Sequence, residues 1–87
     1  MSFIVCFETD DFVYPMGWDE DCPGAINAIM TDGSVAVFNT RAEARQAIRI
    51  STALARLHRA QGRPANEDFI EDIANVRIAS LVPRANT

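Results

Sequence analysis

The sequence predicts an α+β fold: a small antiparallel sheet of three to four strands packed against one long helix and a shorter second helix, in the order β-β-β-α-α-β. Three observations support this prediction. Alternating apolar runs lie near both ends of the chain, one long stretch of helix-forming residues fills its middle, and 87 residues leave room for one core. We therefore expect a single compact domain over residues 1–87, with a frayed tail at 83–87.

The N-terminal part is predicted to contain one strand followed by a long loop. Ser2–Glu8 is rich in β-forming residues and carries apolar side chains on both faces, which is typical of a central strand. Thr9–Gly24 is expected to be a loop, because two prolines, two glycines and five acids in sixteen residues do not favour a regular element.

A β-hairpin is predicted next. In Ala25–Met30 the residues Ile26, Ala28 and Met30 alternate with Asn27 and Ile29, and Val35 and Val37 alternate within Ser34–Phe38. The Asp32-Gly33 pair between the two segments favours a tight turn. At the other end of the chain, Val76–Val82 alternates in the same way and predicts the last strand.

The long helix is predicted at Arg41–Gln61. Thr40 and Glu43 form a capping-box pattern at its start, and Gly62 is typical of the residue that follows a helix. A second, shorter helix is expected from Asn66 to about residue 74. The face of the long helix expected to point toward the core consists of Ala44, Ala47, Ile48, Ile50, Ser51, Leu54 and Leu57.

Charge is strongly segregated along a chain whose net charge is −4. Residues 1–33 hold seven acids and no base, residues 34–63 hold six arginines and one acid, and residues 64–87 hold four acids and two arginines. All eight basic residues are arginine. A GC-rich genome explains this use of arginine, and the planar guanidinium also suits bidentate contacts with carboxylate or phosphate.

Five arginines of the predicted helix lie within an arc of about 80° on its exposed side. We name them the arginine stripe: Arg41, Arg45, Arg49, Arg56 and Arg59. An exposed helix face usually mixes charges of both signs, so this row of like charges calls for an opposite charge nearby. That charge is expected from the acidic segments of the same chain, from an acidic protein partner, or from nucleic acid. The net charge of −4 makes nucleic acid the less favoured partner.

A second candidate surface lies in residues 10–21, which we name the acidic aromatic segment. It holds the only tyrosine and the only tryptophan of the chain between two groups of acids. Tyr, Trp and Met are enriched at the centres of protein interfaces, although these side chains can also complete a small core. The residues expected to bind a partner are Tyr14, Met16, Trp18, Asp19, Glu20 and Asp21 from this segment, and Arg45, Arg49, Arg56 and Arg59 from the arginine stripe.

Catalysis and metal binding are not expected. His58 is the only histidine. The sequence leaves open whether Cys6 and Cys22 form a disulfide, although two cysteines in such a chain are more often free thiols. The sequence contains no Cys-x-x-Cys pair, EF-hand pattern or Gly-rich phosphate loop. We therefore expect a protein that is not an enzyme and holds no metal or cofactor. No apolar run approaches the roughly 20 residues of a membrane span, which predicts a cytoplasmic protein that does not bind membranes.

In size and charge, the whole chain resembles the small proteins of phages and mobile elements, the anti-CRISPR inhibitors among them. Those inhibitors share no motif, so the resemblance assigns no residue role. It implies a non-catalytic inhibitor that binds a host Cas complex and blocks its nucleic-acid binding or nuclease recruitment, in the host cytoplasm. The alternatives are a nucleic-acid-binding accessory or regulatory protein that uses the arginine-rich helix, and a homodimer in which the acidic segment meets that helix.

Overall fold

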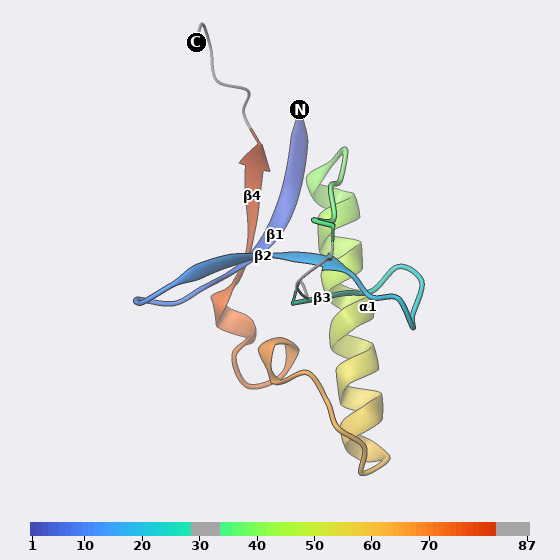
Figure 1. Cartoon of the computed structure of the whole chain (residues 1–87). Helices are drawn as coiled ribbons and strands as arrows, with labels where there is room; N and C mark the ends of the chain where they lie inside the picture. The colour runs from blue at the N-terminus through green and yellow to red at the C-terminus, as the bar shows by residue number, and fades with distance from the viewer. Residues whose placement is uncertain (29–33, 82–87) are drawn as a thin grey trace, which may run out of the picture.

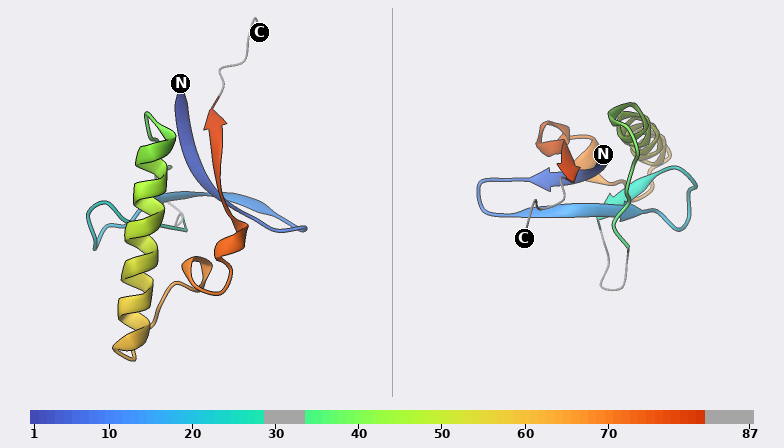
Figure 2. Two further views of the ribbon diagram at one scale, coloured as in Figure 1. Left: turned by 180° about the vertical axis from the view of Figure 1, so that it is seen from behind. Right: turned by 90° about the horizontal axis from the view of Figure 1, so that it is seen from above.

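The predicted α+β class is confirmed by a computed structural model, which describes residues 1–28 and 34–81. A four-stranded antiparallel sheet has the strand order β3-β2-β1-β4, and the single long helix packs on one side of it (Figures 1 and 2). The elements are β1 (Ser2–Glu8), β2 (Val13–Trp18), β3 (Ile26–Ala28), α1 (Arg41–Ala60), two 3-10 turns η1 (Glu67–Phe69) and η2 (Ile73–Asn75), and β4 (Val76–Leu81).

The prediction of a loop over Thr9–Gly24 is wrong in its centre, because β2 forms there. β2 pairs with β1 in a register that places Tyr14 opposite Phe7 and Pro15 opposite Cys6. Pro15 stands at the end of this ladder, where a missing amide hydrogen is tolerated. Pro15 and Gly17 therefore interrupt the sequence pattern of a strand without preventing the strand itself.

The predicted hairpin between Ala25–Met30 and Ser34–Phe38 is also wrong. Gly17 of β2 pairs with Asn27 of β3 and also with Val35, so the two segments lie on opposite edges of β2 rather than beside each other. Residues 34–38 form no strand and make two isolated pairings, the second one between Phe38 and Phe3. The expected turn at Asp32-Gly33 lies outside the described residues.

Residues 34–38 fill a gap that the sheet would otherwise have. The described register joins β1 to β2 only at Cys6–Glu8, whereas β4 pairs with β1 over Ser2–Phe7. Figure 1 shows the result, with β1 and β4 running across the direction of β2 and β3. Phe3 and Phe38 exchange two backbone hydrogen bonds of 2.8 Å in that gap.

The long helix forms as predicted, ending at Ala60 with Gln61 as its C-cap. The Thr40 hydroxyl accepts a hydrogen bond of 3.1 Å from the Glu43 amide at its start. At its end Gly62 has φ +70°, and the Arg63 amide donates to the His58 carbonyl at 2.8 Å, which completes a Schellman motif. The expected core residue Leu57 is 52% exposed, because it lies outside the buried line of Ala44, Ala47, Ser51 and Ala55.

The predicted second helix is replaced by the two 3-10 turns. The Asn66 side chain accepts a hydrogen bond from the Asp68 amide at 3.0 Å, and side chains of this type compete with helical hydrogen bonds. Phe69 is nevertheless buried, at 1% exposure, so the segment still contributes a large side chain to the core. The last strand is confirmed as far as Leu81, and Val82 and the tail at 83–87 lie outside the described residues.

The core lies between α1 and one face of the sheet. Residues at alternating positions of β1, β2 and β4 face the helix, as the pairing of Phe7 with Tyr14 and Val76 requires. Its most deeply buried large side chains come from four separate elements: Phe69, Met16, Ile26 and Val5. Each such side chain stabilises the fold by about 1.5–3 kcal/mol through burial.

Candidate functional site

The acidic aromatic segment does not form one surface. Met16 is fully buried at 0% exposure, so the prediction that it contacts a partner is wrong. Its position on β2 places it on the core face together with Tyr14, which is half-buried. Trp18 is 49% exposed and packs edge-on against Phe38, with ring centroids 5.2 Å apart. The exposed part of the predicted surface is therefore Trp18, Glu20 and Asp21, with Asp19 half-buried between them.

Tyr14 has a structural partner. Its hydroxyl donates a hydrogen bond of 2.7 Å to the Asp68 carboxylate, which ties β2 to η1. Burial, together with this hydrogen bond and the negative charges of Asp68 and Asp72, raises the pKa of Tyr14 to about 12. The ring also stacks against Phe7 and Phe12, at centroid distances of 5.3 and 5.6 Å. Tyr14 thus holds two layers of the protein together.

The three acids after β2 stand at a turn that leads into β3, and we name them the acidic corner: Asp19, Glu20 and Asp21. An Asp19 carboxylate oxygen accepts a hydrogen bond of 2.8 Å from the Asp21 amide, and the Asp19 amide donates to the Ala25 carbonyl at 2.9 Å. Gly24 has φ +85°, and a Cβ at this position would lie 3.3 Å from Ile50 Cδ1. The turn therefore lies directly against α1.

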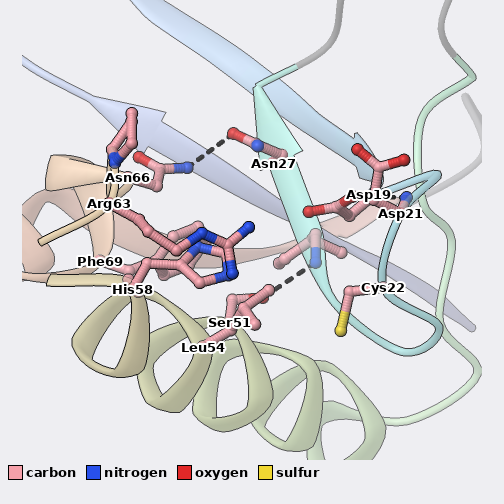
Figure 3. A pocket seen from close by; sticks show the side chains of 13 residues that line it. Asp19, Asp21, Cys22, Asn27, Ser51, Leu54, His58, Arg63, Asn66 and Phe69 are labelled. Carbon is pink, nitrogen blue, oxygen red and sulfur yellow. Dashed lines mark hydrogen bonds between the residues drawn. The ribbon is translucent and has the colours of Figure 1, made fainter. Parts of the chain in front are cut away.

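A pocket of about 500 Å³ opens between the acidic corner and the C-terminal half of α1 (Figure 3). Asp19 and Asp21 stand on one side of it, and His58 and Arg63 stand on the other. Its apolar lining comes from β3, α1 and η1, in the side chains of Ile26, Leu54, Ala55 and Phe69. This volume lies within the range of small-molecule sites in proteins.

Two further contacts hold the pocket in shape. The Ser51 hydroxyl accepts a hydrogen bond of 2.8 Å from the Ile26 amide and donates one of 2.7 Å to the Ala47 carbonyl. Across the pocket rim, the Asn66 side-chain amide donates to the Asn27 side-chain oxygen at 2.6 Å. β3, α1 and the segment before η1 are therefore joined by side-chain hydrogen bonds around one cavity.

The arginine stripe lies on the opposite flank of α1. Relative to the buried line of the helix, the stripe and the pocket residue Leu54 fall on opposite sides, because successive residues advance by about 100°. The first and last arginines have partners: the Arg41 guanidinium lies 5.0 Å from the Phe3 ring centroid, and Arg59 lies 3.7 Å from Glu71.

The three central arginines, Arg45, Arg49 and Arg56, are exposed and make no ion pair within residues 1–28 and 34–81. The idea that the acidic segment covers the stripe is wrong for the acidic corner, which packs against the other flank of the helix. The acids that follow the helix, at residues 67–72, were the other expected cover for the stripe. Among the described residues they form one ion pair with it, between Glu71 and Arg59.

Cys6 and Cys22 are both free thiols, which decides between the two states that the sequence left open. Cys6 is buried in β1, and burial, with a smaller contribution from Glu8, raises the pKa of its thiol. Cys22 lines the pocket on the side of Asp19 and Asp21 (Figure 3). Over the part of the chain that the structure describes, no three His, Cys, Asp or Glu side chains gather as a metal site would require.

The sequence predictions missed the pocket residues Asn27, Ser51, Arg63 and Asn66. Arg63 had one available signal, because Gly62 predicts a helix end that turns the following residue back toward the helix. The other three belong to segments far apart in sequence, whose approach no local pattern indicates.

Comparisons of this chain with protein families, curated proteins and solved structures gave no match. Among the described residues, no helix has the length and apolar character to cross a membrane. The chemistry of the two flanks of α1 is therefore the basis for assigning a function.

Proposed function

We propose that the protein is a non-catalytic interaction module that binds an acidic protein surface through the arginine stripe. The observation that carries this proposal is the row of exposed arginines, Arg45, Arg49 and Arg56, that lack ion pairs within the described residues. Arginines four residues apart on a helix repel each other by a few tenths of a kcal/mol. A partner that brings carboxylates to the row removes this repulsion and gains charge-assisted hydrogen bonds.

The helix presents these arginines in a fixed arrangement. Arg45 and Arg56 are eleven residues apart, which corresponds to about 16 Å along the axis of an α-helix. Both ends of α1 are capped, and its buried line packs on the core, so the backbone that carries the row does not have to be ordered when a partner binds. Guanidinium groups on such a rigid support are suited to bidentate contacts with carboxylates.

A Cas protein subunit is the first partner to test, because the resemblance to anti-CRISPR inhibitors suggests this class of target. Binding would then block the nucleic-acid binding or nuclease recruitment of the complex, in the cytoplasm of the host. An acidic patch near a nuclease or subunit interface is the surface that the arginine stripe would fit.

Nucleic acid is the alternative partner, since the same arginines can contact phosphates. The acidic corner lies on the other flank of the same helix, and the net charge of −4 opposes the approach of a polyanion. Salt separates the two cases, because each phosphate contact contributes a slope of roughly one in the logarithm of affinity against the logarithm of salt concentration.

The test is capture of partners by tagged protein from the nuclease-treated lysate of a CRISPR-bearing bacterium. Arg49→Glu is compared with Arg63→Glu, which makes the same charge change on the other flank of α1. We expect both the unmodified protein and the Arg63→Glu variant to retain a near-stoichiometric acidic partner, and the Arg49→Glu variant to lose it. Equal capture by all three proteins would contradict the proposal.

A second arm of this experiment omits the nuclease. Nucleic acid that is retained by the unmodified protein and lost with Arg49→Glu, with the salt slope given above, would replace the acidic protein by nucleic acid as the partner. Loss of binding with Asp21→Lys but not with Arg49→Glu would instead assign the function to the acidic corner. Asp21 is exposed, so this substitution leaves the core intact.

A further inference from the structure

We propose that the pocket beside the acidic corner binds a zwitterionic ligand of the amino-acid class with an apolar side chain. This inference goes beyond the proposed function, because the pocket and the central arginines lie on opposite flanks of α1. Failure of one therefore leaves the other standing.

The first observation is that opposite charges face the pocket without neutralising each other. Asp19 and Asp21 line one side, and His58 and Arg63 line the other (Figure 3). None of these four side chains makes an ion pair within the described parts of the chain. A ligand with an ammonium group at one end and a carboxylate at the other would meet an opposite charge on each side.

Hydrogen-bonding capacity remains on both sides. The one Asp19 oxygen that accepts from the Asp21 amide leaves the second oxygen of the carboxylate for an ammonium group. The Arg63 guanidinium has five N–H donors, and the structure gives it one contact, from Nη1 to the Gln61 side chain at 3.4 Å. Arg63 can therefore donate two parallel hydrogen bonds to a carboxylate.

The second observation is the apolar floor between the charged sides. Leu54, Ala55 and Phe69 supply it from α1 and η1, and Ile26 supplies it from β3. A branched or aromatic side chain would pack on the half-buried Leu54, above the buried Ile26 and Phe69, while the polar ends stay at the rim. The volume of about 500 Å³ leaves room for an amino acid and bound water.

The third observation is that both sides are held in place by backbone hydrogen bonds. Arg63 follows the Schellman motif, in which its amide bonds the His58 carbonyl at 2.8 Å. On the other side, two backbone hydrogen bonds fix the turn that carries Asp19 and Asp21. The Ala25 amide donates to the Cys22 carbonyl at 3.1 Å, and the Ala25 carbonyl accepts from the Asp19 amide at 2.9 Å. The two backbone segments that carry the charged groups are therefore in place before a ligand arrives, so only their side chains have to be ordered on binding.

The experiment is a titration of ¹⁵N-labelled protein with L-leucine, followed by the backbone amide resonances. N-acetyl-leucine lacks the ammonium group and leucinamide lacks the carboxylate, so they serve as matched probes of the two sides. We expect saturable shifts at Ile26, Ser51 and Arg63 with leucine in the millimolar range. Each probe is expected to bind about tenfold more weakly, the value of one charge-assisted hydrogen bond.

Variants assign the two charged sides. Asp21→Asn and Arg63→Gln are both exposed substitutions, and each is expected to weaken leucine binding about tenfold, whereas Arg45→Gln on the opposite flank leaves it unchanged. Loss of discrimination against leucinamide in the Arg63→Gln variant would identify the carboxylate side. No saturable shift at these amides, or equal binding of leucine and both probes, would overturn the proposal.

Discussion

The two flanks of α1 differ in how many segments of the chain position their charged side chains. On one flank, Arg45, Arg49 and Arg56 extend from the helix alone, and each position follows from the helical period. On the other flank, Arg63 and Asp21 face a cavity that needs three separate segments of the chain. A charged row can thus be built by one element, whereas a pocket depends on tertiary contacts. Damage to the fold is therefore expected to affect the pocket flank most.

The largest effect is expected for Phe69→Ala. Phe69 is almost fully buried and supplies both the core and the floor of the pocket, so its truncation should lower the free energy of unfolding by about 3–5 kcal/mol. Urea denaturation followed by circular dichroism measures this loss. A cost below about 1 kcal/mol would show that η1 contributes little to the fold.

The next largest effect is expected for Ser51→Ala, which leaves the buried Ile26 amide without its acceptor. An unsatisfied buried group of this kind costs about 1–3 kcal/mol. Thr52→Ala is the matched control, because the Thr52 hydroxyl donates only to the Ile48 carbonyl of its own helix. Equal losses of stability in the two variants would show that the bond between Ser51 and β3 adds nothing.

Tyr14→Phe tests the link between β2 and η1. Loss of a hydrogen bond to a carboxylate should cost about 1–2 kcal/mol at neutral pH. The folded protein holds the Tyr14 proton more tightly than the unfolded chain, since its pKa of about 12 exceeds the ordinary value of 10. Protonated Tyr14 therefore makes its full contribution to the free energy of unfolding below about pH 10, and this contribution is lost as the pH rises to about 12.

Urea denaturation at a series of alkaline pH values measures this dependence. The unmodified protein should lose stability across that window, and the Tyr14→Phe variant should lose less. The chain has one tyrosine and no lysine, so few other groups titrate in the same range. Parallel curves for the two proteins would show that Tyr14 has the same pKa in both states.

The smallest effect is expected on the exposed flank. Arg49→Ala should change the free energy of unfolding by no more than about 0.5 kcal/mol, because Arg49 is exposed and its one side-chain hydrogen bond within residues 1–28 and 34–81 is to Gln46 at 3.5 Å. The slight repulsion from Arg45 is relieved at the same time. A loss above about 1 kcal/mol would mean that the arginine stripe serves the fold rather than a partner.

The same contrast explains what could be predicted from the sequence. The long helix, β1 and the arginine stripe follow from local patterns, such as the cap at Thr40 and the helical period. β2 was missed because Pro15 and Gly17 mask an alternation that places Met16 in the core. The prediction of a hairpin was wrong because alternation shows which side chains face inward but does not identify the strand beside which a segment will pair.

The candidate site divides in the same way. The exposed arginines were predicted by residue number. Trp18, Glu20 and Asp21 are exposed and Asp19 is half-buried. The pocket could not be predicted, because Ser51 meets β3 across 25 positions of sequence and Asn66 meets Asn27 across 39. Contacts between residues so far apart in sequence depend on the packing of the whole chain, so a local sequence pattern does not indicate them.

The bond between Ser51 and β3 also bears on aggregation. β3 is an edge strand, and the amides along a free sheet edge are templates onto which strands of other molecules can add. Here the Ile26 amide is already bonded to a hydroxyl of the helix, so intermolecular strand addition is blocked at that point. Ile26 and Ser51 are both buried, so α1 itself covers this part of the edge and protects it from fibril growth.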